Sequence, residues 1–384
     1  MQTIYLDTNA TTRLDPAVFE AMIPYFTERY GNPSSSYGFG ARVKADLDRA
    51  RTQVATLLGC GPDEIIFTSC GSESDNAAIR AALAACPGKR HIVTTAVEHP
   101  AVLKLCTHLE AREGCPVTYL AVDRQGRLDP RALGKALRDD TAVVSVMWAN
   151  NETGNVHPIA EMAATARERG VLFHTDAVQA VGKLPIDLAA APVDMLSLSG
   201  HKLHAPKGIG ALFVRRGTPF APLIIGGGQE SGRRAGTENT AAIVGLGKAC
   251  ELAMERMAEE GACLSQLRDR LESGLLEAVP DTIVNGDPGE RLPNTTYLSF
   301  GSVSAADILR ELDRHGICAS SGSACCSSHA KPSHVLTAME TPLRFAHGSI
   351  RFSLGRFNGP QDVEQVLALL PGIIATLRAS YSHG

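Results

Sequence analysis

Short apolar runs rich in β-branched and aromatic residues alternate with longer segments of helical periodicity through the first two-thirds of the chain. Strands are predicted at residues 65–68, 91–95, 118–122, 142–148, 171–176, 194–199 and 209–215. Such alternation is typical of a mainly parallel sheet whose two faces are covered by helices. The pattern therefore predicts an α/β protein.

Beyond residue 240 the pattern changes. One helical stretch covers about residues 240–279, with charges on one face that include Glu255, Arg256, Glu259 and Arg268. A chain of 384 residues exceeds the usual size of one compact domain. We expect a large domain over residues 14–255 and a smaller α/β domain formed by residues 1–13 and 256–384. The smaller domain is predicted to contain strands near 294–299 and 349–354 and helices near 305–315 and 360–379.

The interval 319–330 has almost no large apolar side chain, so it cannot anchor itself in a core. We expect a mobile, exposed loop over about residues 320–334. Cys325 and Cys326 lie in its middle. A linker with incidental cysteines is one interpretation, and an accessible, reactive thiol is the other.

Composition and charge exclude some classes of partner. Hydrophobic residues make up 44% of the chain, charged residues 20%, and the formal net charge is −4. Basic residues form no block longer than the pairs at 215–216 and 233–234, which argues against nucleic acid. The amino terminus lacks the pattern of a signal peptide, and we expect no segment that spans a membrane. These features favour a cytoplasmic protein.

The ten cysteines are scattered along the chain, which favours reduced thiols over a disulfide framework. No cysteine or histidine spacing of the zinc type appears, so we expect no structural metal. Most of the cysteines are expected in the core, where a thiol behaves as a small apolar group. This group comprises Cys60, Cys70, Cys86, Cys106, Cys250 and Cys263.

The turn Ser199-Gly200-His201-Lys202 follows a predicted strand, at the edge of the sheet where α/β proteins place their chemistry. Another predicted strand ends on Asp176, and Gln179 follows three residues later. A lysine can hold an aldehyde cofactor as a Schiff base, and an aspartate can keep a pyridinium nitrogen protonated. Together they suggest pyridoxal phosphate chemistry, although a surface lysine and a helix-capping aspartate would give the same pattern.

Other predicted strands end on polar residues too. Gly71 and Ser72 stand at the start of a predicted helix, where free backbone N–H groups favour a phosphate, or where the serine is an ordinary N-cap. His99 follows the strand at 91–95, and Asn150 and Asn151 follow the run at 142–148. A lone histidine at such a place is usually structural. The carboxyl ends of five predicted strands nevertheless converge on one region.

These residues belong to motifs that resemble the cysteine desulfurases of the NifS/IscS group, in order and along essentially the whole chain. Residues 146–154 and 201–208 look more like the nitrogenase-associated NifS than the housekeeping IscS. The resemblance rests on Leu6-Asp7-Thr8-Asn9-Ala10-Thr11-Thr12, Gly31-Asn32-Pro33-Ser34-Ser35, Glu73-Ser74-Asp75-Asn76, His174-Thr175-Asp176-Ala177-Val178-Gln179, Gly200-His201-Lys202, Arg234-Ala235-Gly236-Thr237-Glu238-Asn239 and Ser320-Ser321-Gly322-Ser323-Ala324-Cys325.

The resemblance implies a fold-type-I pyridoxal phosphate enzyme and a role for each matching residue. Lys202 would hold the cofactor and transfer protons, and Cys325 would be the nucleophile that receives sulfur. The cofactor would be bound by Gly71, Ser72, His99, Asn151, Asp176, Gln179, Ser199 and His201, with His99 also assisting proton transfer. Thr237 would reach the cofactor phosphate of a neighbouring subunit, which requires a homodimer. Substrate would be bound by Arg351, Asn32 and Asn151, with Arg356 as a second candidate for the carboxylate.

The activity implied is conversion of L-cysteine to L-alanine, with a persulfide on Cys325 that supplies an iron–sulfur scaffold protein, for nitrogenase. Cys325 is expected to contact an iron–sulfur cluster during transfer. Cys326 stands where relatives often have a hydroxyl residue, so its role is open. A selenocysteine lyase or an aminotransferase on the same fold is the nearest alternative, but neither reaction needs a protein thiol. An iron–sulfur scaffold is the alternative from another class, and the scattered cysteines weigh against it.

Overall fold

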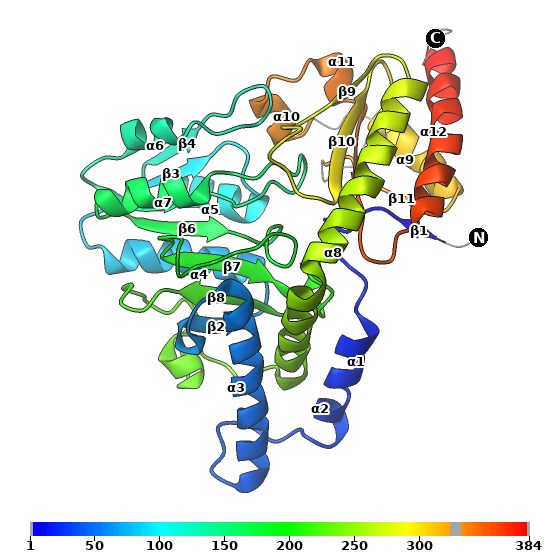
Figure 1. Ribbon diagram of the computed structural model, residues 1–384. Coiled ribbons are helices and arrows are strands. Elements are labelled where there is room, and N and C mark those ends of the chain that lie inside the picture. Colours follow the sequence, from blue (N-terminus) through cyan, green and yellow to red (C-terminus); the bar gives the residue numbers. More distant parts are fainter. Residues whose placement is uncertain (1–2, 323–331, 382–384) are drawn as a thin grey trace.

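A seven-stranded sheet forms the centre of the larger part of the molecule (Figure 1). The structure is a computed structural model that describes residues 3–322 and 332–381. The strand order is β2-β8-β7-β6-β5-β3-β4. The strands are β2 (Ile65–Thr68), β3 (His91–Thr95), β4 (Val117–Leu120), β5 (Thr141–Ser145), β6 (Leu172–Asp176), β7 (Met195–Ser199) and β8 (Gly210–Val214).

The sheet is mainly parallel, as the sequence predicts, with β8 as its antiparallel member. β8 pairs antiparallel with both β7 and β2, whereas β4, β3, β5, β6 and β7 pair in parallel. Only the single turn η2 (Gly200–Lys202) lies in the ten residues between β7 and β8. A parallel crossover needs a dozen residues or more, so the chain turns back instead. This reversal places Lys202 at the sheet edge.

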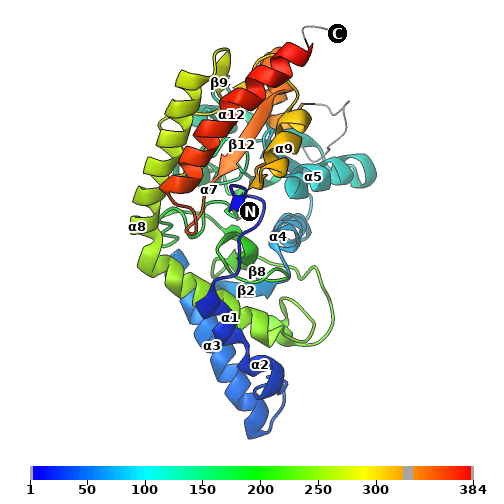
Figure 2. The ribbon, with the colours of Figure 1, turned by 90° about the vertical axis from the view of Figure 1, so that its right-hand side faces the viewer.

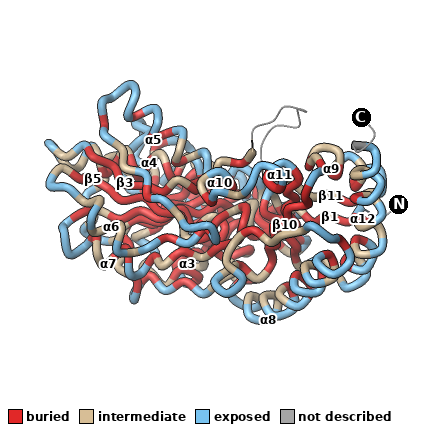
Figure 3. Tube along the Cα trace, turned by 90° about the horizontal axis from the view of Figure 1, so that it is seen from above, coloured by how far each residue is buried: buried red, intermediate tan, exposed pale blue. Residues whose placement is uncertain are grey.

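Helices cover both faces of this sheet, so its strands are buried on both sides. Side chains such as Phe67, Phe173 and Leu196 pack in one hydrophobic cluster with α1 (Pro16–Met22), α3 (Gly38–Leu58), α6 (Pro130–Ala136), α7 (Ile159–Glu168) and the first half of α8. Their neighbours, including Ile66, Val143 and Met195, pack on the opposite face with α4 (Gly71–Ala85) and α5 (Pro100–Glu113). Figure 3 shows the buried strands between exposed outer helix faces.

A three-stranded antiparallel sheet, β12-β10-β9, and the parallel pair β1-β11 form the smaller part. Its hydrophobic cluster takes side chains from Ile4 and Leu6 at one end of the chain to Ile374 at the other. The elements are β1 (Ile4–Tyr5), β9 (Thr282–Val284), β10 (Thr295–Phe300), β11 (Ile317–Cys318), β12 (Ser349–Ser353), α9 (Ala305–Arg314), α10 (His334–Ala338), α11 (Leu343–Ala346) and α12 (Pro360–Tyr381). The short α2 (Pro24–Thr27), η1 (Pro62–Glu64) and η3 (Gln229–Gly232) lie outside this part.

Helix α8 (Thr240–Ala278) runs through both parts, as Figures 1 and 2 show, and confirms the helix expected at 240–279. Residues up to Ala253 belong to the first cluster, and residues from Leu264 onward belong to the second. The division of the chain at residue 255 stays a prediction. Arg268, expected on a charged outer face, is instead buried, because its guanidinium donates a hydrogen bond to the carbonyl of Leu292 (2.7 Å).

Helix α12 corrects the expectation that no segment is long and apolar enough to span a membrane. Of the described residues, Pro360–Ser380 meets that criterion by length and composition. Its Val363, Val366, Leu370 and Ile374 lie three or four residues apart and pack into the second hydrophobic cluster. Leu367, Leu369, Ile373 and Leu377 are partly buried against the same cluster, so apolar residues outside the buried face add to the hydropathy of this helix.

Several cysteines are less buried than we expect from the apolar residues around them in the sequence. Cys106 and Cys250 are in the core as expected, but Cys60, Cys70 and Cys86 are only partly buried. Cys263 is exposed, because it lies on the outer side of α8 between the two clusters. Cys325 and Cys326 and the middle of the predicted 320–334 loop lie outside the described residues.

Candidate active site

A cavity of about 900 Å³ opens at the carboxyl edge of the large sheet, against the smaller part of the molecule. Parallel strands deliver the residues that follow them to this common edge. The cavity is lined from the large part by Gly71, Ser72, Asp75, His99, Asn151, Glu152, Asp176, Gln179, Ser199, His201 and Lys202, and from the smaller part by Ser320, Gly322, Ser333, His334 and Arg351. Most of the predicted site residues are thus brought together.

Lys202 reaches the cavity from the turn η2. Its Nζ donates hydrogen bonds to the carbonyl oxygens of Asn9 and Ala10 (2.7 Å to Ala10). Burial, and then the positive charge of Arg351, lower the pKa of this amine to about 8. The neutral, nucleophilic form of this amine is therefore more accessible near neutral pH than that of an exposed lysine.

Asp176 ends strand β6 with its carboxylate buried in the cavity floor. Its Oδ1 accepts a hydrogen bond from the N–H of Val178 (2.9 Å). Burial raises the pKa of Asp176, while the charges of His99 and Lys202 oppose that shift. A cationic ring nitrogen beside this carboxylate would favour its charged form.

The first turn of α4 and the turn after β7 form the part of the cavity that suits a phosphate. The Ser199 Oγ is buried and has no hydrogen-bond partner among the described residues. A Cβ on Gly71 would lie 2.8 Å from a methyl group of Val178, so only glycine fits there. The free N–H groups that start this 15-residue helix, with the Ser199 hydroxyl, fit a phosphate group. Lys202, Asp176 and this cradle together match pyridoxal phosphate.

His99 and Gln179 lie in the same cavity. His99 caps α5, with its Nδ1 accepting a hydrogen bond from the N–H of Ala101 (3.1 Å), so the neutral ring carries its proton on Nε2. Burial lowers the pKa of this imidazole. The Gln179 amide is oriented by two contacts: Nε2 donates to the carbonyl of Asn9 (2.9 Å), and Oε1 accepts from Nζ of Lys183 (2.7 Å). His201 contacts Thr11 Oγ1 through Nδ1 (3.1 Å).

Arg351 enters the cavity from β12. Its Nη1 donates to the carbonyl of Asn151 (2.8 Å) and its Nη2 to Asp7 Oδ1 (2.6 Å). Its Nε is buried and has no partner in the described part of the chain. A guanidinium that lines the cavity and is paired with a single carboxylate, that of Asp7, is suited to bind the carboxylate of a ligand as well.

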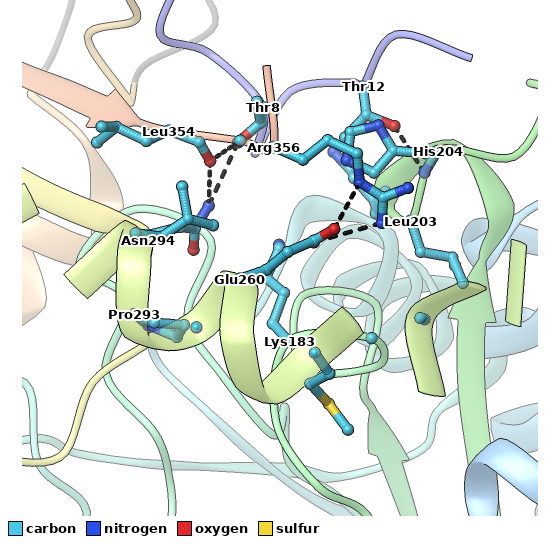
Figure 4. A pocket seen from close by; sticks show the side chains of 17 residues that line it. Thr8, Thr12, Lys183, Leu203, His204, Glu260, Pro293, Asn294, Leu354 and Arg356 are labelled. Carbon is cyan, nitrogen blue, oxygen red and sulfur yellow. Dashed lines mark hydrogen bonds and ion pairs between the residues drawn. The ribbon is translucent and has the colours of Figure 1, made fainter. Parts of the chain in front are cut away.

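Arg356 does not reach this cavity. Its guanidinium donates to Asp15 Oδ2 (2.8 Å) and Glu260 Oε2 (3.3 Å) at a separate, much smaller pocket, where Figure 4 shows the Glu260 contacts. Two acidic partners already satisfy its charge. We therefore exclude Arg356 from the carboxylate-binding role.

Asn32 and Thr237 are exposed and do not line the cavity. Asn32 uses its side chain locally, because Oδ1 accepts from the N–H of Ser34 (2.9 Å). The segment before Thr237 is tied to α4 through an ion pair between Arg234 and Glu73 (2.9 Å). Within one subunit, neither Asn32 nor Thr237 contacts the candidate site.

Sequence reasoning missed the buried carboxyl groups of the cavity. Asp75, on α4, leaves Oδ1 without a hydrogen-bond partner among the described residues, and burial raises its pKa well above the usual range. Glu152 in the cavity wall is buried too, and so is Glu98, which precedes His99 but does not line the cavity. Burial raises the pKa of Glu98 to about 8 and the pKa of Glu152 to about 7. The signals in the sequence were the places of Glu98 and Glu152 beside His99 and Asn151, and the place of Asp75 in one of the motifs that carry the resemblance. The described residues contain no group of three His, Cys, Asp or Glu side chains suited to a metal ion.

Comparisons with known proteins agree with this geometry. The class-V aminotransferase family model matches residues 4–366. A cysteine desulfurase of Trichormus azollae is 55% identical over 99% of this chain and 94% of its own. The cysteine desulfurase NifS of Azotobacter vinelandii is 54% identical over 98% of this chain and 94% of its own. A solved NifS-like protein superposes with a TM-score of 0.92 at 38% identity, over 98% of this chain and all of its own.

The chain therefore belongs to the class-V aminotransferase family, which confirms the fold-type-I α/β architecture expected from the sequence. Full-length identity above 50% makes it, within that family, one of the cysteine desulfurases. The resemblance to the cysteine desulfurases is confirmed.

Proposed function

We propose that this protein uses pyridoxal phosphate to convert L-cysteine to L-alanine, and that Cys325 receives the sulfur as a persulfide. The observation that carries this proposal is that Lys202 and Arg351 face one cavity. An amine that can hold an aldehyde thus lies across from a guanidinium that can hold the carboxylate of an amino acid.

When bound, pyridoxal phosphate supplies an aldehyde that condenses with amines and a protonated ring that accepts electrons. Lys202 would hold this group through Nζ and, once released, would move the proton taken from the substrate Cα. The Asp176 carboxylate would keep the ring nitrogen protonated. The phosphate would be held by Gly71, Ser72, Ser199 and His201, and the ring by His99, Gln179 and Asn151. The substrate carboxylate would bind Arg351.

The sulfur step requires a thiolate close to the substrate sulfur. A sulfur–sulfur bond forms between the Cys325 thiolate and that sulfur, the carbon–sulfur bond of the substrate breaks, and the carbon takes a proton. One L-cysteine and one thiol thus give one L-alanine and one persulfide, without an added oxidant or reductant.

We propose that the persulfide sulfur passes to an iron–sulfur scaffold protein in the cytoplasm, and that Cys325 contacts the assembling cluster during this transfer. The name NifS of the Azotobacter vinelandii relative supports a link with nitrogenase. Neither nucleic acid nor a membrane enters this proposal as a partner.

Purified protein supplied with pyridoxal phosphate and L-cysteine is expected to form L-alanine and, with a thiol reductant, sulfide in equal amounts. Borohydride treatment before substrate is expected to attach the cofactor covalently to Lys202. Alanine assay, sulfide assay and peptide mass spectrometry measure the three quantities. Alanine without sulfide, or iron–sulfur absorbance without a borohydride-stable adduct, would contradict the proposal.

The proposed enzyme is a homodimer in which Thr237 of each subunit completes the phosphate site of the other. The exposure of Thr237 supports this, because a residue that does not line the cavity of its own subunit is available to contact the cavity of another subunit. Sedimentation equilibrium at assay concentration is expected to give twice the chain mass of 40.7 kDa. Thermal stability should also rise with protein concentration. A fully active monomer would rule out the shared site.

A further inference from the structure

Glu152 is a buried carboxylate at the wall of the active-site cavity, one residue after Asn151. It is 2% exposed and lies in the connection between β5 and α7. Its backbone N–H donates to Asn150 Oδ1 (2.9 Å), so the turn that carries it is fixed. Burying a carboxylate is unfavourable unless nearby groups compensate, and these groups show what the residue does.

The groups around Glu152 come from both sides of the segment that contains Cys325. On the side before it, Gly322 lies against the carboxylate: a Cβ there would be 2.7 Å from Glu152 Oε2 and 2.6 Å from Tyr297 Oη. Gly322 also has a φ of 72°, which other residues rarely adopt. On the side after it, the hydroxyl of Ser333 donates a hydrogen bond to Glu152 Oε2 (2.5 Å). One carboxylate thus contacts Gly322 and Ser333, which belong to the two flanks of that segment: residues 320–322 before it and residues 332–334 after it.

Neighbouring contacts hold the same two flanks. The Tyr297 hydroxyl donates to the carbonyl of Ser321 (2.9 Å), and Ser320 exchanges two backbone hydrogen bonds with Arg351 (2.6 and 3.2 Å). His334 contacts the carbonyl of Glu98 through Nε2 (2.9 Å). The flanks are therefore attached to the residues next to His99 and Asn151, and to Arg351 itself.

The negative charge of Glu152 is compensated by groups close to its carboxylate. Burial raises the pKa of Glu152 to about 7, and the hydrogen bond from Ser333 and the charge of Arg351 oppose the shift. The hydroxyl of Ser333 also accepts a hydrogen bond from the N–H of Val335 (3.0 Å), at the first turn of α10. Removing the carboxylate would leave the Ser333 hydroxyl without its acceptor and Gly322 beside a void.

We propose that Glu152 is a positioning residue for sulfur transfer, which joins Gly322 and Ser333, the described residues on either side of the segment that contains Cys325, and so supports persulfide formation on Cys325. This inference rests on the proposed role of Cys325. It assigns Glu152 no contact with cofactor or substrate. Cofactor binding and L-cysteine binding should therefore survive its removal, while transfer to Cys325 slows.

The test compares Glu152→Ala and Glu152→Gln with the wild-type holoenzyme and with Glu340→Gln. Glu340 is a matched control, because it is an exposed residue whose ion pair with Arg124 lies on the surface. A glutamine keeps an oxygen that can accept from Ser333, so it should restore part of the lost rate. The measurements are the visible spectrum of the bound cofactor, KM for L-cysteine, kcat, and the single-turnover rate of persulfide formation on Cys325 by mass spectrometry.

Glu152→Ala is expected to lower kcat and the single-turnover rate by about 10- to 100-fold, since a misplacement of about 1 Å costs that order of rate. KM and the cofactor spectrum should change less than twofold. Glu152→Gln should fall between Glu152→Ala and wild type, and Glu340→Gln should match wild type. A single-turnover rate in Glu152→Ala within twofold of wild type would overturn the inference, and so would a loss of cofactor binding by folded Glu152→Gln.

Tyr297→Phe keeps the inference testable if Glu152→Ala does not fold. It removes one hydroxyl, which donates to the carbonyl of Ser321 and also interacts with Glu152. It is expected to slow persulfide formation by roughly 5-fold, about the effect of one neutral hydrogen bond. An unchanged rate in Tyr297→Phe together with an unchanged rate in Glu152→Gln would overturn the inference. A wild-type enzyme that makes alanine with no persulfide on Cys325 would refute the proposed function instead.

Discussion

Replacing Lys202 by alanine is expected to lower the rate of alanine formation from L-cysteine by at least about 10³-fold. The variant loses both the amine that would hold the cofactor and the base that would move the substrate proton. Borohydride should then fix no cofactor to the protein. Steady-state assay and peptide mass spectrometry after borohydride treatment measure both effects.

Lys135→Ala provides the matched control, because Lys135 is an exposed residue on α6, away from the cavity. It should retain the wild-type rate and the borohydride adduct. The Lys202→Ala protein should still fold, since the hydrogen bonds of Nζ go only to the carbonyls of Asn9 and Ala10. An active Lys202→Ala enzyme would remove the basis for the proposed chemistry.

Replacing Cys325 by alanine is expected to abolish persulfide and sulfide formation while cofactor binding and L-cysteine binding remain. Cys326→Ser should keep most of the activity. Moving a sulfur by one residue displaces it by roughly 3.8 Å and turns its side chain in another direction, so position should matter more than the number of thiols. Mass spectrometry after one turnover with L-cysteine locates the added sulfur.

The two cysteine variants control for each other, because each retains one thiol in the same segment. The initial spectral change on adding L-cysteine should be the same in both variants and in wild type, and it should persist in Cys325→Ala. A persulfide found on Cys326 in active enzyme would overturn the assignment. Normal sulfide release by Cys325→Ala would do so as well.

Much of the sheet and most of the cavity could be predicted from the sequence, because both depend on local patterns. Buried strands appear in the sequence as short apolar runs. The polar residues that follow parallel strands lie together at the carboxyl edge of the sheet. Lys202, Asp176 and Ser199 are placed by this rule alone. β1, β9 and β11 were missed, since two or three residues carry too little pattern to mark a strand.

The sequence does not distinguish between residues whose roles depend on partners that are far away along the chain. Arg351 and Arg356 lie five residues apart with similar neighbours, yet one faces the cavity and the other pairs with Asp15 and Glu260. The burial of Glu152 likewise depends on Gly322, Tyr297 and Ser333, which are remote in the chain. Tertiary packing alone decides such cases.

The continuous helix α8 has a consequence for the thermodynamics of substrate binding. Its 39 residues make roughly 58 Å of helix at 1.5 Å per residue, along an axis that bends in Figure 2, and they connect the core beneath Lys202 to the core beneath Arg351. One unbroken helix, rather than a loop, therefore joins the part that carries the amine to the part that carries the guanidinium. Groups joined through helical backbone keep more of their relative position before substrate binds than groups joined by a flexible loop, so less binding free energy is spent on ordering the enzyme.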